Sequence, residues 1–554
     1  LEYEDFDKDF EVRKNVTSSE IVSLAYRRWG LGFMERLHGE FCCAVWDNQK
    51  RRIILARDPY GHKPLHYSVN QGRFVFSSEI KGILASGVNS EIDWTNLSDF
   101  LSLNCIPSPG TLFKNIHQVN PGSLVISESG SVNIKSYWTP EISVNNQLSL
   151  EESVVELSEA IKRSVKRRMV SKDTYCFLSG GLDSSAVVSF AAEISDSPIN
   201  AICVGFEDEE ENELDSAITM AEHVGAKLHH VIASPDSFFD MLDKMVYHHD
   251  GPFTDTSAYP TYYAAKLASK YTDLILTGDG PDQALGGSGH YIFASNNNIF
   301  AARNKAFQVL SRLGAKIISS VTKDPIPSLI SKIERNLYRK SLSPVGACYD
   351  LRSFFPELVK QYICTNEFWR EHLSSPPYRH PELWFEEAGV NDDVNRYLYA
   401  DMKFYIPDDL MIKVDRMCMA NSLETMSPFQ DKDLGKIVNS LPGSYKLHKD
   451  SCNNYETKYI LRKICENRLP EKLLGKSKHG FSIPVAKWLR QSGGNCLREI
   501  LLDQKSLSRG YFRKSAIEKM LNCFMGDAGD YFFPHPNGIV GLLTLELWHR
   551  KYID

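Results

Sequence analysis

The stretch Ser179-Gly180-Gly181-Leu182-Asp183-Ser184-Ser185 decides the fold of the central part of this 554-residue chain. Residues 174–178 before it form an apolar run, which predicts a short, buried parallel strand. Residues 186–192 after it are also apolar and predict a packed helix. A strand, a glycine turn and a helix N-terminus form an anion site, because paired glycines let the backbone approach a ligand and free N–H groups favour phosphate.

This loop is not a Walker A motif, because it lacks the Gly-Lys-Ser/Thr sequence. Asp183 within it suits a magnesium ion, since a hard cation on phosphate needs a carboxylate nearby. The competing interpretation is a plain glycine turn between two core elements.

The charge balance of the chain is slightly acidic. There are 63 Lys and Arg against 70 Asp and Glu, a formal net charge of −7, which argues against nucleic-acid and membrane partners. The 12 cysteines are scattered without metal-site spacing, so we expect reduced thiols and a cytoplasmic protein. No apolar run approaches the ~20 residues of a membrane span. The basic run 162–168 lies on a predicted helix, where a solvated face is the favoured interpretation.

The first 140 residues alternate strands and turns. Residues 41–47 and 52–58 predict a hairpin joined by the polar residues 48–51, and further strands are predicted at 73–79 and 123–126. This pattern is typical of an antiparallel α+β domain.

A polar linker is predicted at about residues 140–150, and strands then alternate with helices. Such a series implies a parallel sheet with its ligand at the carboxyl ends of the strands. Residues 295–400 are expected to be mainly helical, apart from a loop at 324–327, where two prolines cannot share a helix. The other predicted elements are strands at 199–206, 229–233 and 273–278 and a core helix at 542–548.

The sequence motifs of the first 140 residues resemble those of the class II glutamine amidotransferase domain of asparagine synthetases. That resemblance implies an Ntn-type amidotransferase domain with antiparallel sheets over residues 1–140. It rests on four blocks in order: Glu20-Ile21-Val22, Leu37-His38-Gly39-Glu40-Phe41, Ala56-Arg57-Asp58-Pro59-Tyr60-Gly61-His62-Lys63-Pro64-Leu65 and Ser77-Ser78-Glu79-Ile80-Lys81.

Domains of this kind use an N-terminal cysteine whose thiol attacks the glutamine amide. Leu1 cannot do so, and the segment that would carry the cysteine is expected to be absent. The resemblance also implies that Ser18 lies at the glutamine site, where the family has an aspartate. A hydroxyl cannot pair with the ammonium of glutamine as a carboxylate does, so both features argue against glutamine use.

Five blocks of the second part, in order, resemble the synthetase domain of the same family. This resemblance implies an α/β ATP-pyrophosphatase domain with a parallel sheet and a helical C-terminal part over residues 150–554, which splits ATP to AMP and pyrophosphate. The blocks are the loop 179–185, Asp250-Gly251-Pro252-Phe253, Thr277-Gly278-Asp279-Gly280-Pro281-Asp282, Lys413-Val414-Asp415-Arg416-Met417 and Lys478-His479-Gly480-Phe481.

The resemblance implies a role for individual residues. Asp183 and Asp282 would hold Mg²⁺ on the pyrophosphate, and Lys478 would stabilise charge on the α-phosphate and the leaving pyrophosphate. Asp279 would act as the base that deprotonates the attacking amine. ATP contacts are implied for Phe177, Leu178, Ser179, Gly180, Gly181, Asp183, Ser184, Ser185, Val204, Thr277 and Gly278.

The sequence departs from the family at Gly251, Gln283 and Met426, each of which replaces a charged residue that could shape the acceptor pocket. The favoured function is an asparagine synthetase that uses ATP, aspartate and glutamine or ammonia, and a homodimer is expected. The alternative is an adenylating cyclase of the β-lactam synthetase or lasso-peptide cyclase type, with an inactive glutaminase domain. A nucleotide-binding homologue without turnover and a tRNA-modifying pyrophosphatase are less favoured, the latter because of the net charge.

Overall fold

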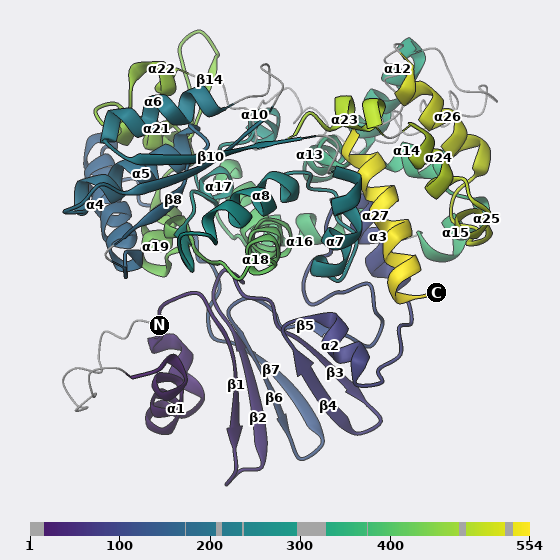
Figure 1. The fold of residues 1–554 in the computed structure, drawn as a ribbon, viewed down its shortest axis with the longest axis horizontal. Coiled ribbons are helices and arrows are strands. Elements are labelled where there is room, and N and C mark those ends of the chain that lie inside the picture. Colours follow the sequence, from purple (N-terminus) through teal and green to yellow (C-terminus); the bar gives the residue numbers. More distant parts are fainter. Residues whose placement is uncertain are drawn as a thin grey trace.

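A computed structural model describes residues 16–171, 173–206, 213–234, 238–295, 328–373, 375–475, 483–492, 494–526 and 536–554. Two antiparallel sheets built from the first 136 residues lie on one side of the molecule, below the rest of the chain in Figure 1. A parallel sheet and most of the helices form the larger remainder. The predicted fold class, antiparallel sheets followed by a parallel sheet and a helical C-terminal part, is confirmed.

The first antiparallel sheet has the strand order β1-β2-β6-β7. The predicted hairpin is present, with Cys42 opposite Arg57 and Asp47 opposite Arg52. The second sheet has the order β4-β3-β5. The strands are β1 (Cys42–Asp47), β2 (Arg52–Arg57), β3 (His66–Asn70), β4 (Arg73–Ser77), β5 (His117–Gln118), β6 (Ser123–Glu128) and β7 (Ser131–Ser136), and the helical segments are α1 (Ser18–Trp29), η1 (Gly30–Arg36), α2 (Ile80–Ala85) and α3 (Trp94–Leu103).

The helix α4 (Leu150–Arg168) begins where the predicted linker ends. Ser149 caps it by accepting a hydrogen bond from the Glu152 backbone, and the Glu152 carboxylate accepts one from the Ser149 backbone. This reciprocal capping box satisfies two donors that the first turn would otherwise leave without a partner, and so fixes the start of the helix.

The central sheet has the order β10-β9-β8-β11-β12, and every pair in it is parallel. Alternate side chains of β9 enter two cores. Ala201 and Cys203 pack among residues of α4 and α5, while Ile202 and Val204 pack among residues of α7 and α8. Both faces of the sheet are therefore covered, which explains why its strands read as continuous apolar runs. The strands are β8 (Tyr175–Phe177), β9 (Asn200–Phe206), β10 (Lys227–Ala233), β11 (Leu274–Leu276) and β12 (Glu424–Met426).

Helices make up most of the remaining described chain, including the part of 295–400 that begins at residue 328. The predicted loop at 324–327 lies outside the described residues. The helices are α5 (Leu182–Ile194), α6 (Leu214–Val224), α7 (Phe238–His249), α8 (Ala258–Ala268), α9 (Pro281–Ala284), α10 (Gly289–Ser295), α12 (Ser328–Ser341), α13 (Pro344–Arg352), α14 (Glu357–Ile363), α15 (Asn366–His372), α16 (Arg379–Glu387), α17 (Asp393–Lys403), a π-helical turn (Ile406–Leu410), α18 (Met411–Met419), a 3₁₀ turn (Pro428–Gln430), α19 (Lys432–Ser440), α20 (Gly443–Lys446), α21 (Tyr459–Cys465), α22 (Glu471–Leu474), α23 (Val485–Ser492), α24 (Gly494–Leu501), α25 (Gln504–Ser508), α26 (Lys514–Met525) and α27 (Pro536–Tyr552), with a small hairpin of β13 (Leu447–Lys449) and β14 (Tyr455–Thr457).

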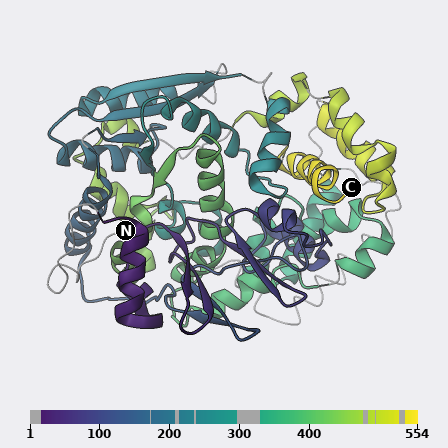
Figure 2. The same cartoon turned by 60° about the horizontal axis from the view of Figure 1, so that its bottom comes forward.

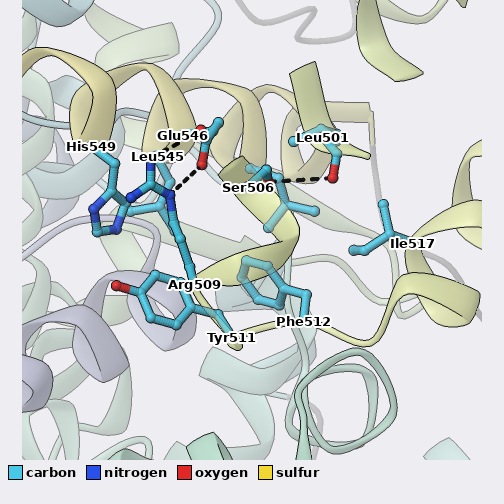
Figure 3. A pocket seen from close by; sticks show the side chains of 10 residues that line it. Leu501, Ser506, Arg509, Tyr511, Phe512, Ile517, Leu545, Glu546 and His549 are labelled. Atoms are coloured by element: carbon cyan, nitrogen blue, oxygen red, sulfur yellow. Dashed lines mark hydrogen bonds and ion pairs between the residues drawn. The ribbon is translucent and has the colours of Figure 1, made fainter. Parts of the chain in front are cut away.

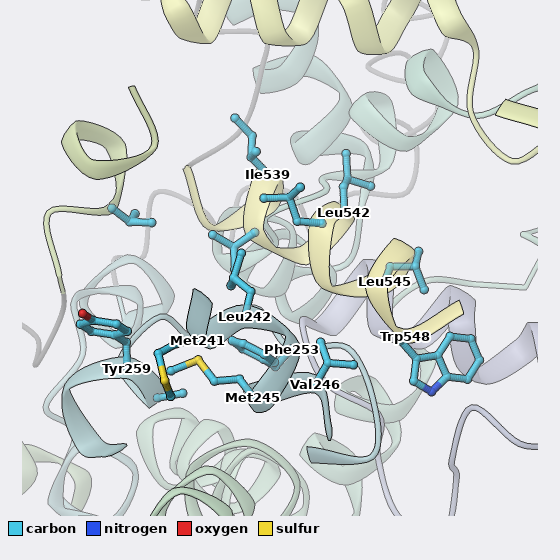
Figure 4. Packing of buried hydrophobic residues seen from close by; sticks show 14 of the residues in the cluster. Met241, Leu242, Met245, Val246, Phe253, Tyr259, Ile539, Leu542, Leu545 and Trp548 are labelled. Carbon is cyan, nitrogen blue, oxygen red and sulfur yellow. The ribbon is translucent and has the colours of Figure 1, made fainter. Parts of the chain in front are cut away.

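The last helix, α27, is buried along most of its length. Figure 4 shows Leu542, Leu545 and Trp548 of this helix lying over Met245 and Val246 of α7, within one continuous apolar cluster. The predicted core helix is thus confirmed. The structure shows no helix in its described ranges with the length and apolar character that crossing a membrane requires.

A small cavity of about 20 Å³ lies beside α27, with Arg509, Tyr511 and His549 in its wall (Figure 3). Arg509 forms an ion pair with Glu546 there at 2.7 Å. The volume admits about one water molecule, so this cavity is a packing feature of the C-terminal helices rather than a substrate site.

The N-terminal sheets are joined to the rest of the chain through buried charges. Figure 2 brings this side of the molecule forward. The Glu40 carboxylate accepts hydrogen bonds from the Arg168 side chain at 3.3 Å and from the Ser427 backbone at 2.7 Å, and Arg168 also contacts Asp431 at 2.9 Å. The prediction that the run 162–168 is a solvated face is therefore wrong for Arg168, whose side chain is 8 % exposed, because carboxylates distant in sequence surround it.

Candidate active site

Two loops come together at the carboxyl end of the parallel sheet. The loop 179–185 follows β8, and the loop 277–282 follows β11. These strands are neighbours, with Cys176 opposite Leu276. The chain first builds β9 and β10 on one side of β8 and then places β11 and β12 on the other. In sheets of this kind, ligands bind beyond the carboxyl ends of the strands where the order reverses, which is where both loops lie.

Glycine is required where these loops make their closest contacts. Gly180 has a φ of +79°, and a Cβ atom there would lie 2.4 Å from the Cβ of Ser216. A Cβ atom on Gly278 would lie 2.6 Å from the backbone nitrogen of Ser184. Any side chain at either position would push backbone segments apart. Glycine at 180 therefore lets the first loop pack on α6, and glycine at 278 lets the two loops pack directly on each other.

The loop 179–185 presents a helix N-terminus to its surroundings. The Ser179 backbone N–H donates to Ser184 Oγ and the Gly181 N–H donates to Ser179 Oγ, both at 3.2 Å, which fixes the turn. α5 then begins without a side-chain cap. Ser185 Oγ is buried and has no hydrogen-bond partner among the described residues. The first-turn N–H groups, the helix dipole and the narrow glycine cradle suit a phosphate group.

Asp183 and Asp282 face each other across the two loops. The ammonium nitrogen of Lys458 lies 2.5 Å from Asp183 Oδ2 and 2.6 Å from Asp282 Oδ1, so one cation reaches both carboxylates. No group of three or more His, Cys, Asp or Glu side chains in the described ranges is placed to hold a metal. Two carboxylates are nevertheless what Mg²⁺ needs when phosphate oxygens and water complete its shell, so the residues present fit that ion.

Asp279 lies on the second loop beside a buried lysine. Burial raises the pKa of Asp279 above its ordinary value, and the nearby Lys413 ammonium partly offsets this rise. Lys413 Nζ lies 3.2 Å from Asp255 Oδ2 and donates to Ser257 Oγ at 2.8 Å. A carboxylate with a raised pKa can hold a proton nearer to neutral pH, which is the property that a general base for an amine needs.

A cavity of about 90 Å³ lies next to this group and is lined by residues from both parts of the chain. His66 and Ile80 come from the N-terminal part, and Asp409 and Lys413 come from the later part. Burial lowers the pKa of His66 well below its ordinary value, so its ring is neutral. At a share of ~30 Å³ per molecule, the volume admits about three molecules of water size, and therefore a small nucleophile such as ammonia.

Two further aspartates border the cavity. Burial raises the pKa of Asp408 to about 6, and burial together with Asp255 raises the pKa of Asp409 to about 7. Asp408 also accepts a 2.7 Å hydrogen bond from the backbone of Ser108 in the N-terminal part. Sequence reasoning missed both aspartates, because they lie on the π-helical turn and belong to no block of the resemblance.

The remaining residues predicted to contact ATP lie on, or directly after, the strands β8, β9 and β11. Phe177 and Val204 pack in one core cluster, and Leu178 packs in the other. Thr277 is fully buried and its hydroxyl lies 3.0 Å from that of Ser427. The structure thus brings Phe177, Leu178, Ser179, Gly180, Gly181, Asp183, Ser184, Ser185, Val204, Thr277, Gly278, Asp279 and Asp282 to the carboxyl-end region of neighbouring strands β9, β8 and β11.

Two predicted residues do not join this group. Ser18 is exposed in the first turn of α1, and its neighbours Thr17 and Glu20 form a capping box for that helix. The Thr17-Ser18-Ser19-Glu20 pattern therefore has a local structural role, and glutamine contact by Ser18 stays a prediction. Lys478 lies outside the described residues.

Lys458 is the residue at the carboxylate pair that sequence reasoning did not identify. It follows β14 directly and precedes α21. Its segment Tyr455-Glu456-Thr457-Lys458 has no glycine turn or repeated pattern that would signal a ligand site. Only the fold, which brings it across 275 residues to Asp183, shows its place.

Comparison with known proteins agrees with this geometry. The family profile described as asparagine synthase matches residues 156–550, and the profile described as glutamine amidotransferase domain matches residues 3–138. The chain belongs to the asparagine synthase family. It is 30% identical over 97% of its length to asparagine synthetase [glutamine-hydrolyzing] 1 of Bacillus subtilis, covering 81% of that protein.

More distant relatives carry other names. A putative asparagine synthetase [glutamine-hydrolyzing] of Mycobacterium bovis is 27% identical over 97% of the chain and 80% of that protein. The protein named amidase chyE of Penicillium rubens is 25% identical over 87% of the chain and 74% of that protein. The family supports an ATP-dependent ligase that forms amides. Because relatives in the family carry different names, membership alone does not identify the acceptor substrate, and the site itself must be considered.

Proposed function

We propose that this chain is an asparagine synthetase. The carboxylate oxygen of aspartate attacks the α-phosphorus of ATP, the bond to pyrophosphate breaks, and β-aspartyl-AMP forms. Ammonia, supplied as such or from glutamine, then attacks the acyl carbon, and AMP leaves with the electron pair of the broken C–O bond. The proton lost by the nitrogen passes to Asp279. Activation is needed because a free carboxylate is a poor electrophile.

The observation that carries this proposal is the meeting of Asp183 and Asp282 at the glycine cradle. The cradle would hold the phosphates, and the two carboxylates would hold Mg²⁺, which neutralises charge on the leaving pyrophosphate when it is bound. Thirteen predicted residues converge on this one edge of the sheet, although they come from three separate strand ends. Lys478 is assigned to the same phosphates by resemblance alone.

The cavity lined by Lys413 and Asp255, whose charges act on Asp279, supports a small nitrogen nucleophile. It is lined by residues of the N-terminal part and of the later part of the chain, and its volume of about 90 Å³ accommodates a molecule of the size of ammonia. Its wall holds the neutral ring of His66 and carboxyl groups whose pKa values burial raises. Ammonia that enters this cavity would therefore lie next to groups able to take its proton.

A second candidate, adenylation of an acceptor other than aspartate, is favoured by one observation. Gln283 is buried beside Asp282, and its Oε1 has no hydrogen-bond partner among the described residues. Met426 lies opposite Leu276, next to the loop of Asp279. Neither residue supplies the charge that would pair with the second carboxylate or the ammonium of aspartate, so an acceptor with fewer charges also fits.

The test is pyrophosphate release from ATP in the presence of Mg²⁺, with aspartate or candidate cyclisation substrates as acceptors. We expect Asp183→Asn and Asp282→Asn each to abolish release while the circular-dichroism spectrum of the chain is retained. The matched control is Asp243→Asn, which removes a carboxylate that is 62% exposed and pairs with Lys551 at the surface. If either site variant released pyrophosphate at the parent rate, the metal assignment would be wrong.

Two further properties stay proposals. All twelve cysteines are free thiols, which supports a reducing compartment such as the cytoplasm. A homodimer is proposed from the resemblance alone.

A further inference from the structure

Lys458 occupies the position between the two carboxylates that face the phosphate cradle. Its Nζ contacts Asp183 Oδ2 at 2.5 Å and Asp282 Oδ1 at 2.6 Å, and its side chain is 5% exposed. The two aspartates belong to different loops, so the ammonium ties one loop to the other.

The backbone around Lys458 is specialised for this contact. Lys458 has φ 52° and ψ 37°, in the left-handed region that side-chain-bearing residues seldom adopt. On the other side, a Cβ atom on Gly287 would lie 1.9 Å from Asp282 Oδ1 and 2.0 Å from Cε of Lys458. The contact therefore requires an unfavourable backbone conformation at one residue and a glycine at another. Such local strain persists only where the surrounding structure holds it, and it is common at functional sites.

The two carboxylates carry two negative charges, and the Lys458 ammonium neutralises one of them. Contact with both carboxylates favours the charged form of Lys458, so the side chain is an ammonium. A divalent cation bound by the same oxygens would lie within a few ångströms of that ammonium, and the repulsion between them would be weakly screened in a buried site.

We propose that Lys458 is a built-in counter-cation that holds the two loops together before substrate binds and that a divalent cation must displace. The inference rests on the proposed function, because that function assigns Asp183 and Asp282 to Mg²⁺. Without nucleotide, the chain binds a divalent cation weakly, since binding breaks the charge-assisted hydrogen bond of Lys458 to Asp183 and its ion pair with Asp282. When phosphates are present, the displaced ammonium gains new oxygen partners, so metal and nucleotide binding become favourably coupled through Lys458.

The experiment measures Mn²⁺ binding to the full, nucleotide-free chain near neutral pH, by the electron paramagnetic resonance signal of free Mn²⁺. Lys458→Met and Lys458→Gln remove the charge and keep a side chain of similar length. Both carry a Cβ atom, as lysine does, so the left-handed backbone remains equally strained. We expect both variants to bind Mn²⁺ at least ~10-fold more tightly than the parent, because a positive charge next to the site is gone.

The matched control is Lys463→Met, which removes the same charge from α21, the helix that follows Lys458. Lys463 pairs with Glu466 at the surface and does not contact the two aspartates. Its Mn²⁺ affinity should stay close to that of the parent. Thermal denaturation adds a second readout: without metal the Lys458 variants should melt below the parent, and Mn²⁺ should raise their melting temperature more than it raises that of the parent.

The outcomes separate this inference from the proposed function. If the double variant Asp183→Asn/Asp282→Asn binds Mn²⁺ as the parent does, the metal site itself is wrong and the inference falls with it. If the aspartates are needed but the Lys458 variants bind Mn²⁺ no more tightly, the metal site stands and the counter-cation role is refuted. Lys458 variants that stay unfolded even with Mn²⁺ also refute it, because the metal should replace the lost ammonium.

Discussion

Replacing Gly278 by alanine should separate the two catalytic loops by a distance that the structure fixes. The new Cβ atom would lie 2.6 Å from the backbone nitrogen of Ser184 and 2.7 Å from its Cα, whereas ordinary contact begins at 3.4 Å. Both contacted atoms belong to the backbone, so no side chain can rotate away. The loop that carries Asp183 must therefore move by about 0.8 Å, the difference between 3.4 and 2.6 Å, from the loop that carries Asp282.

Two consequences follow from that displacement. Overpacking of this kind typically costs about 1–3 kcal/mol of stability, and a displacement approaching 1 Å between groups that act together can lower a rate ~10²-fold. We expect Gly278→Ala to lower the rate of pyrophosphate release ~10²-fold with ATP, Mg²⁺ and aspartate at saturating concentrations. Thermal denaturation should show a smaller loss of stability than deletion of a core side chain would cause.

The control is Gly289→Ala, at the start of α10 in the same region of the chain. Its Cβ atom would meet nothing within 4 Å, and Gly289 does not have a positive φ. Alanine there should leave the rate unchanged and slightly favour the helix. A Gly278→Ala chain with the parent rate would refute the direct packing of the two loops, and with it the common phosphate site.

Two further predictions concern buried carboxylates. Burial and Asp255 raise the pKa of Asp409 from 3.8 to about 7, so the folded chain binds this proton more tightly than the unfolded chain. The stability that the proton contributes is therefore present below about pH 4 and is lost as the pH rises to about 7. Asp409→Asn should flatten this fall in denaturant titrations at several pH values, and an unchanged slope would contradict the assignment. Glu40→Ala should lower the free energy of unfolding by about 3–5 kcal/mol, because it leaves Arg168 buried with one carboxylate partner fewer. The control, Glu91→Ala at the exposed pair with Lys114, should change the free energy of unfolding by at most about 1 kcal/mol. Equal effects of the two variants in chemical denaturation would show that the buried contact contributes no more than the surface pair.

The parts of the fold that the sequence predicts are those with a local cause. The hairpin of β1 and β2 shows in the apolar runs on both sides of a polar turn, and the strand, turn and helix around Gly180 show in the glycine pair between two apolar runs. The parallel sheet follows from strands that alternate with helices. Each of these depends on residues within about fifteen positions of one another, so periodicity and turn chemistry are enough to find them.

The parts that the sequence did not predict depend on contacts between distant segments. Arg168 lies in a basic run that is typical of a solvated helix face, yet Asp431, 263 residues away, pairs with it. Lys458 is an ordinary lysine at the start of a short helix until Asp183 and Asp282 are brought to it. The raised pKa values of Asp408 and Asp409 arise from burial between two parts of the chain, which no pattern within residues 406–410 contains.

One helix connects the N-terminal sheets to the chemistry proposed for the later part. On α18, Asp415 forms an ion pair with Lys63 at 3.0 Å. The Arg416 side chain donates a hydrogen bond to the backbone carbonyl of Ser78 at 2.8 Å. The N-terminal part therefore holds this helix in place. Lys413 of the same helix, one turn earlier, contacts Asp255 and lowers the pKa that burial gives to Asp279. Because Lys413, Asp415 and Arg416 share one helix, contacts that hold α18 against the N-terminal part also help to position the Lys413 ammonium near Asp279. The N-terminal part therefore contributes to the electrostatics of the proposed base, whether or not it handles glutamine.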